Sequence, residues 1–264
     1  MISIASSSEE VRPIFLSHGA PDILARDTLA GEFLGELGGL LPTPRGIVVV
    51  SAHWQHQQAM VTGPGSLETL HDFGGFDPEL YQRRYPASGA PWLLETVAEH
   101  LEVHGDPVSM DKRRGLDHGA WIPLMRMFPA ADIPVLQLAL KPGPDFHHHL
   151  TQGEGLAALS AMGVLVMGSG SITHNLHQLK SPGENPDSWA VRFQAQLHRG
   201  LMAGNGERLA TTIREDPAYR QAHPTPEHLA PLFVAMGAGG RGALAEQLHV
   251  SYDYGNLCMG IYRF

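Results

Sequence analysis

The sequence predicts a single α/β domain whose central sheet is largely parallel or mixed and is flanked by helices. Short, continuous apolar runs alternate along the chain with longer segments whose apolar residues recur at helical spacing. The chain has 264 residues, a length that α/β folds often contain as one unit. None of its Gly- and Pro-rich connections is long or polar enough to act as a linker. We therefore expect one domain over residues 1–264, with 1–10 as a flexible N-terminus.

Apolar runs without polar alternation predict the strands, because such runs suit a sheet that is covered on both faces. The clearest is 47–51, which is β-branched and continuous. The other predicted strands are 13–16, 133–140, 164–167 and 257–262.

Helical spacing of apolar residues predicts the helices that connect these strands. Residues 91–104 begin with Pro91, which is favoured in the first turn of a helix, and continue with an apolar stripe. Residues 28–40 place Phe33 and Leu37 at helical intervals. The remaining predicted helices are 120–128, 146–161, 189–204 and 228–238.

Composition and charge exclude several classes of protein. The formal net charge of −9 argues against a nucleic-acid partner, which would need a basic face. The single Cys excludes a disulfide framework and a Cys-rich zinc module. No apolar run approaches the roughly 20 residues that cross a bilayer, and the first residues lack the pattern of a signal peptide. We therefore expect a cytoplasmic protein with no nucleic-acid or membrane partner; the sequence gives no indication of its oligomeric state.

Histidines follow the predicted strands at the edge where ligands bind. The chain contains 16 His, so a metal here would be held by imidazole and carboxylate groups and not by thiolate. Predicted strands run into His18, into His53 and, through a Gly-Ser loop, into His174, and His228 begins a predicted helix. In open α/β sheets the binding crevice lies outside the carboxyl ends of the strands. We expect these histidines to meet in one pocket, although each alone could be an ordinary hydrogen-bonded loop residue.

Other features of the sequence are less specific. His118 lies between Asp117 and a Gly just before a predicted helix, where a polar residue is often only a cap. The triplet 147–149 predicts an exposed helix start, and Cys258 lies in a predicted strand as a core residue. The chain lacks the G-x-S-x-G, G-x-x-x-x-G-K-[ST] and H-E-x-x-H patterns of Ser hydrolases, P-loop proteins and zinc proteases.

The motifs taken together resemble a known family. FLSHGAP, VVVSAHW, HDFGGF, GLDHGAW, SITHNL and PTPEHLAPL occur in this order between residue 13 and the C-terminus. The chain is similar to the DODA-type, class III extradiol aromatic ring-opening dioxygenases, which include bacterial and plant DOPA 4,5-dioxygenases. The resemblance implies an enzyme that cleaves the ring of a catechol-type substrate, such as DOPA, catechol or a protocatechuate-like acid, with O2.

The resemblance also implies a mononuclear, non-heme metal site. His18, His53 and His228 resemble its ligands, with His223 or Glu227 as alternatives to His228 as the third. Fe(II) is expected for activity, and Zn2+ is a second expected occupant, because imidazole suits both ions.

Two further histidines gain roles from the resemblance. His174 resembles the catalytic acid/base, close enough to become a fourth ligand when zinc is bound. His118 resembles a second-sphere group that acts on substrate or oxygen. Aromatic and cationic residues nearby could form the substrate pocket, or could equally pack in the core or face solvent: Trp54, Phe73, Phe76, Tyr85, Arg83, Arg84, Arg113 and Arg114.

Two rival functions use the same residues. A zinc-dependent hydrolase would activate water at the same histidines and would need no O2. A binding module without catalysis would hold a metal in a closed coordination sphere. Replacement of His174 separates these possibilities, because an acid/base is needed for turnover and a primary ligand for metal retention.

Overall fold

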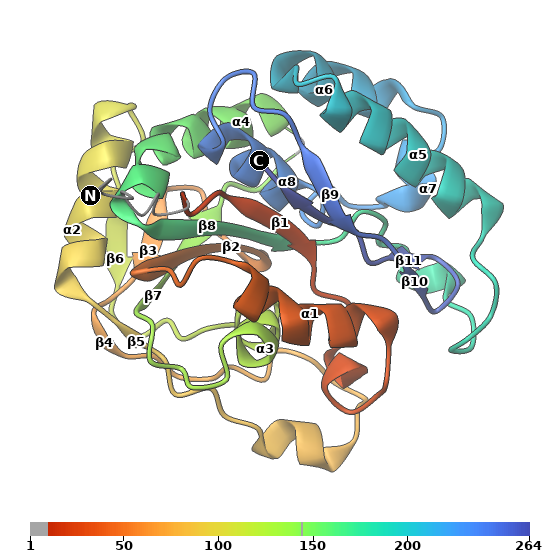
Figure 1. Cartoon of the computed structure of the whole chain (residues 1–264), viewed down its shortest axis with the longest axis horizontal. Coiled ribbons are helices and arrows are strands. Elements are labelled where there is room, and N and C mark those ends of the chain that lie inside the picture. The colour runs from red at the N-terminus through yellow and green to blue at the C-terminus, as the bar shows by residue number, and fades with distance from the viewer. Residues whose placement is uncertain (1–9, 144) are drawn as a thin grey trace, which may run out of the picture.

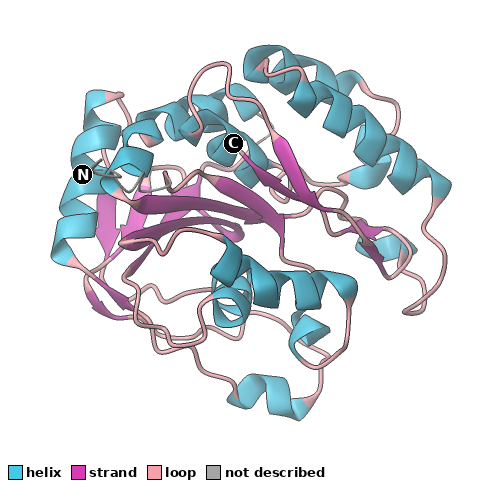
Figure 2. Ribbon diagram, viewed as in Figure 1, coloured by secondary structure: helices cyan, strands magenta, loops and turns pink. Residues whose placement is uncertain are grey.

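A mixed sheet forms the centre of the molecule, and helices cover both of its faces (Figures 1 and 2). The computed structural model describes residues 10–143 and 145–264. The 8-stranded sheet has the strand order β6-β3-β7-β2-β8-β1-β12-β9. The expected single α/β domain with a mixed sheet is confirmed, whereas the expectation for residues 1–10 falls almost wholly outside the described residues.

Four predicted strands form the middle of the sheet: β1 (Ile14–Ser17), β2 (Gly46–Gln55), β7 (Val135–Leu140) and β8 (Val164–Gly170). They pair in parallel, with β8 between β1 and β2 and with β7 on the other side of β2. Their carboxyl ends therefore lie at one edge, as the sequence predicts.

Shorter strands extend the sheet and form two separate ladders. On one side lie β3 (Met60–Thr62) and β6 (Ser109–Asp111), and on the other β12 (Ile261–Arg263) and β9 (Glu246–His249). The small ladders pair β4 (Gly65–Ser66) with β5 (Ser88–Gly89), and β10 (Tyr252–Asp253) with β11 (Leu257–Cys258).

The predicted strand 257–262 is wrong as a single element. Its first part is β11, which pairs with β10, and its second part is β12, which pairs with β1 in the main sheet. The chain changes sheets around Gly260, whose carbonyl accepts a hydrogen bond from the Ser17 backbone. A Cβ at Gly260 would lie 2.8 Å from the Ile172 side chain, so the crossing needs glycine.

Side chains that alternate along the strands divide the core between the two faces. Ile47 and Val49 belong to a cluster with α1 (Leu29–Leu40) and α3 (His118–Met127). Val48 and Val50 belong to the opposite cluster, with α2 (Pro91–Val103), α4 (Phe146–Gly155) and α8 (Ala230–Ala238). This burial on both faces explains the continuous apolar strands.

The remaining helices pack around the second cluster or connect the strands. They are α5 (Ser188–Met202), α6 (Gly206–Thr212) and α7 (Tyr219–Ala222), with the short 3-10 helices η1 (Pro21–Leu24), η2 (Pro78–Gln82), η3 (Ala157–Met162), η4 (Leu176–Gln178) and η5 (Ile213–Glu215). Within the described ranges, no helix combines the length and the apolar character that a membrane span requires.

Three predicted helix boundaries are corrected. The predicted helix 146–161 is α4 followed by η3. The helix predicted from 228 begins at Ala230, which places His228 in the loop before it. The helix predicted from 120 begins at His118, because the Asp117 side chain caps it by accepting from the Ala120 backbone.

Candidate metal centre

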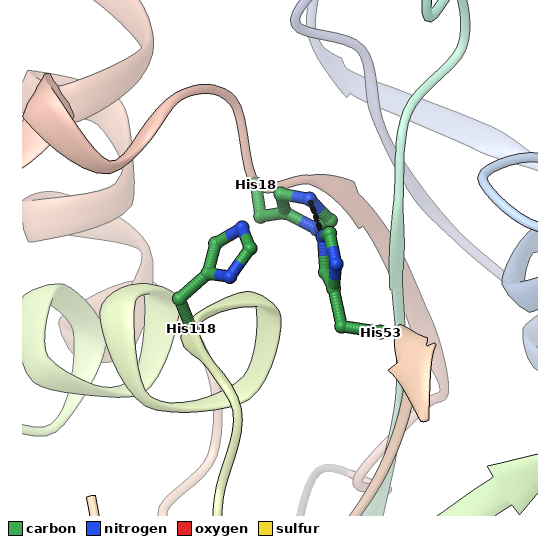
Figure 3. Close-up of side chains that lie close together, drawn as sticks. All are labelled: His18, His53 and His118. Carbon is green, nitrogen blue, oxygen red and sulfur yellow. Dashed lines mark hydrogen bonds between the residues drawn. The ribbon is translucent and has the colours of Figure 1, made fainter. Parts of the chain in front are cut away.

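Five histidines from separate parts of the chain converge at the carboxyl edge of the sheet. His18 follows β1, His53 lies near the end of β2 and His118 begins α3. His174 follows β8, and His228 precedes α8. Figure 3 shows three of these rings turned toward one another, two of them from the sheet edge and one from α3.

The ring positions define one cluster. The Nε2 atoms of His18 and His53 are 3.1 Å apart, and the rings of His53 and His118 have centroids 3.9 Å apart. The His228 ring lies 5.0 Å from that of His53 and 5.5 Å from that of His18. His174 stacks on His228 with centroids 3.4 Å apart.

Possible ligand atoms fall into two separate sets within this cluster. Those of His18, His53 and His118 lie within 4.8 Å of one another. Those of His174, Glu227 and His228 also lie within 4.8 Å of one another. The structure therefore brings together His18, His53, His174 and His228, and adds His118 to the immediate neighbours of His18 and His53.

Hydrogen bonds define which nitrogen of His18 carries the proton. The Ser169 hydroxyl donates to the Gly119 carbonyl, so its oxygen is free to accept. His18 Nδ1 lies 3.0 Å from that oxygen and therefore donates to it. The lone pair of His18 Nε2 consequently faces His53 and the interior of the cluster.

His228 presents its Nε2 atom in the same way. Its Nδ1 lies 3.0 Å from a Glu227 carboxylate oxygen, which can only accept, so Nδ1 carries the proton. The other nitrogen, Nε2, is buried and has no hydrogen-bond partner within the described structure. A buried lone pair without a partner is costly in a protein interior, and a cation at this position would satisfy it.

His118 is held by a carboxylate. Its ring Nδ1 and its backbone N both donate to Asp72 Oδ1, over 3.0 Å and 2.9 Å. This contact leaves His118 Nε2 unprotonated when the ring is neutral. Metal-binding histidines commonly donate their second nitrogen to a carboxylate or carbonyl, and the contact has the same effect here.

Burial keeps His18, His53, His174 and His228 uncharged. Desolvation, followed by the charges of the neighbouring histidines, lowers the pKa of His53 to about 3 and that of His174 to about 4. The same causes hold the pKa of His18 and of His228 well below the ordinary value. Neutral imidazole is the form that binds metals, so the donor set, the converging lone pairs and the unpartnered His228 nitrogen fit a divalent ion.

A buried carboxylate supports the end of β2. Asp117 is fully buried and accepts from the Ser51 hydroxyl over 2.7 Å, from Arg114 over 2.9 Å and from the Gln137 amide. The Ser51 oxygen in turn accepts from the His53 backbone over 3.2 Å. Asp117 also caps α3, so one side chain joins the segments that carry His53 and His118.

Glycines allow the segments to approach closely enough for the histidines to meet. A Cβ at Gly119 would lie 2.5 Å from Ser51 Oγ and 3.0 Å from the His53 ring. A Cβ at Gly170 would lie 2.1 Å from the His228 carbonyl, which accepts instead from the Ser171 backbone. Glycine at the end of β8 thus permits the close approach of the loop that carries His228.

A cavity of about 500 Å³ opens beside the histidines. Of the aromatic residues proposed for a substrate pocket, Phe73 and Phe76 line it. Tyr85 does not, because it is buried with its hydroxyl donating to the Phe128 carbonyl. Trp54 is also away from the cavity and packs under Arg114.

Several residues of interest lie outside the cluster's ligand sets. His223 is buried and its Nε2 donates to the Ile172 carbonyl, so it packs behind the site. Cys258 is fully buried, and burial raises its pKa to about 12, which confirms a core residue. The prediction that residues 147–149 form an exposed helix start is wrong for His149, which is 1% exposed.

The sequence interpretation missed the residues that orient the histidines. Asp72, Ser169 and Ser51 were not singled out, although each lies in or beside a quoted motif. Asp72 is the second residue of HDFGGF, but nothing in that motif indicates that its side chain contacts a histidine. Sequence alone gives no signal that Asp72 and Ser169 contact histidines far away along the chain.

Comparison with known proteins gives the context for this geometry. Residues 36–262 match the family model described as the catalytic LigB subunit of aromatic ring-opening dioxygenase. A 4,5-DOPA dioxygenase extradiol from Beta vulgaris is 40% identical over 254 residues, covering 95% of each chain. The Escherichia coli K12 protein with the same name is 37% identical and covers 89% of this chain and 88% of its own.

A solved structure has the same fold. An uncharacterised protein from Escherichia coli K12 superimposes with a TM-score of 0.81 at 32% sequence identity. The match covers 96% of this chain and 99% of the other.

Proposed function

This chain belongs to the LigB family of aromatic ring-opening dioxygenases and is an extradiol ring-cleavage dioxygenase, and we propose that its substrate is a catechol with a side chain on the ring. The relatives named 4,5-DOPA dioxygenase extradiol support a DOPA-like catechol. The cavity of about 500 Å³ beside the histidines has room for a single-ring substrate.

The metal ligands in this proposal are His18, His53 and His228. The single observation that carries it is the buried, unpartnered Nε2 of His228, close to two imidazoles whose own Nε2 atoms face each other at 3.1 Å. His174, stacked on His228, is close enough to become a fourth ligand. A bound Fe(II) ion supplies both Lewis acidity and redox chemistry at this site, whereas Zn2+ supplies only Lewis acidity.

His174 and His118 are the proposed acid/base and substrate-orienting groups. Both line the cavity beside the proposed ligands. His174 is neutral near pH 7, because burial lowers its pKa to about 4, so it can accept a proton from a catechol hydroxyl. His118 donates Nδ1–H to Asp72 and thereby turns Nε2 toward the substrate. Phe73 and Phe76 form an apolar wall that excludes water from the ring.

The decisive experiment measures oxygen uptake with a panel of substituted catechols after anaerobic loading with Fe(II). We expect one O2 consumed for each catechol opened, and no uptake by protein loaded with Zn2+. Equal turnover with zinc would contradict the redox role of the metal. Hydrolysis of an ester or amide by the zinc form without O2 would instead support the hydrolase.

Two variants assign the third ligand. His228→Ala should abolish tight metal binding, measured by competition with a chromogenic chelator, while His118→Ala should retain the metal and lose turnover. The reverse pattern would make His118 the ligand, as its proximity to His18 and His53 also permits. His174→Ala is expected to retain the metal and lose turnover.

A further inference from the structure

The part of the cavity away from the histidines contains no positive charge. Its walls there are largely apolar and include Pro21, Phe76, Leu176, Leu179 and Leu257. Among the described residues, no Lys or Arg lines it, and residues 1–9 and 144 include neither type. The carboxylate of Asp72 lines the cavity beside His118.

Behind the cavity wall, two carboxylates outweigh the positive charge of the Arg26 guanidinium. Arg26 stacks on the ring of Tyr254, a cavity-lining residue, at 4.6 Å. The Arg26 Nε lies 3.0 Å from an Asp22 carboxylate oxygen, and a terminal nitrogen pairs with Asp253. The Tyr254 hydroxyl also donates to Asp22. Two carboxylates against one guanidinium leave this group with a net negative charge.

Two of the arginines that the sequence suggested for the substrate pocket, Arg114 and Arg84, are engaged elsewhere. Arg114 pairs with the buried Asp117 and stacks on Trp54. Arg84 bonds to the backbone carbonyls of Tyr81 and Arg83 on the exposed surface. The possibility that Arg83, Arg84, Arg113 and Arg114 form part of the substrate pocket is therefore not supported, because none of the four lines the cavity.

We propose that this enzyme selects catechols whose side chain is neutral or cationic overall and discriminates against a side chain that carries a net negative charge. The inference rests on the proposed catechol substrate and adds its charge class. The amino-acid side chain of a DOPA-like molecule belongs to the favoured class, because its ammonium group balances its carboxylate. A propionate or acetate side chain has no such balance and would face Asp72 and the Asp22–Arg26–Asp253 group.

The size of the discrimination follows from Coulomb's law. At a separation of about 8 Å and an effective dielectric constant of about 40, one uncompensated carboxylate weakens binding of an anionic side chain by about fivefold. The net charge of −9 on the chain acts in the same direction. A metal ion attracts the catechol oxygens of both classes of substrate equally, so it does not remove the difference between their side chains.

The test compares 3-(3,4-dihydroxyphenyl)propionate with its carboxamide, which has nearly the same size and no charge. Calorimetry measures the dissociation constant of each with the Fe(II)-loaded protein under anaerobic conditions, and kcat/KM is measured separately in air. We expect the amide to bind at least about fivefold more tightly at low salt. The difference should shrink when about 0.5 M NaCl screens the charges.

A substitution in the cavity wall provides a second, independent test of the charge selection. Leu176 lines the cavity and is 57% exposed, so a longer polar side chain can be accommodated. Leu176→Lys should improve binding of the propionate relative to the amide, whereas the uncharged control Leu176→Gln should leave their ratio as in the wild type.

The outcomes separate this inference from the proposed function. Tighter amide binding without turnover of either compound would support the charge selection and refute the dioxygenase substrate. Equal or tighter binding of the propionate, or binding of neither compound, would overturn the charge selection, and turnover of the propionate would in that case still support ring cleavage.

Discussion

Replacing Gly119 with Ala should damage the metal site while leaving the fold intact. The added Cβ would lie 2.5 Å from Ser51 Oγ, 3.0 Å from the His53 ring and 3.2 Å from the His18 ring. Ordinary contacts of a Cβ begin at 3.4 Å, so Ser51 Oγ and the His53 ring must move by several tenths of an ångström or more, and the His18 ring by less. A metal site tolerates ligand displacements of only about 0.2 Å.

The expected loss is therefore in metal affinity. Disturbing the groups that orient metal ligands commonly weakens binding by about 10–100-fold, and we expect a loss in this range for Gly119→Ala. Folding without metal should change less, because Ala has a helix propensity about 1 kcal/mol better than Gly and this gain offsets part of the strain in α3. Competition with a chelator measures affinity, and thermal unfolding of the metal-free protein measures stability.

Gly35→Ala is the matched control. Gly35 also lies inside a helix, α1, but a Cβ there would meet no atom within 4 Å. It should stabilise the protein by about 0.5–1 kcal/mol and leave metal affinity unchanged. Wild-type affinity in Gly119→Ala would refute the proposal that this glycine positions His53 and His18.

Three further changes probe the buried polar groups. Asp117→Ala removes the buried partner of Arg114 and should lower the free energy of unfolding by about 3–5 kcal/mol, measured with urea; a change below about 1 kcal/mol would contradict a supporting role for this carboxylate. Burial lowers the pKa of His149 to about 3, so below pH 6.5 the unfolded chain binds the proton first and stability should fall by up to about 1.4 kcal/mol per pH unit, levelling off near pH 3. His149→Asn should make this pH profile less steep, and an unchanged slope would exclude His149 as a contributor. Tyr85→Phe leaves the Phe128 carbonyl without its buried donor and should cost about 1–3 kcal/mol with metal affinity unchanged, whereas a loss of metal would place Tyr85 in the site.

Local sequence patterns predict the middle of the sheet well. The run at 47–51 is apolar throughout because both faces of β2 are covered, and this condition leaves a continuous signal in the sequence. His18 and His53 could be placed at one edge because parallel strands end together. These predictions depend on neighbours along the chain and on a general rule of sheet topology.

Features that depend on distant parts of the chain could not be predicted. The break between β11 and β12 arises because two different sheets supply their partners, and no residue in 257–262 is unfavourable in a strand apart from Gly260. His149 looks like the exposed start of a helix but packs into the interior. The pairing of Asp22 with Tyr254 joins segments from opposite ends of the sequence.

The path of the chain through the cluster gives a bound ion a mechanical role. His18 follows the first strand, and His228 precedes the last helix, so a metal held by both would cross-link early and late parts of the polypeptide. The unfolded chain does not hold these two ligands together, so the free energy of binding the ion adds to the stability of the folded state. A chelator should then act on this enzyme as a mild denaturant as well as an inhibitor.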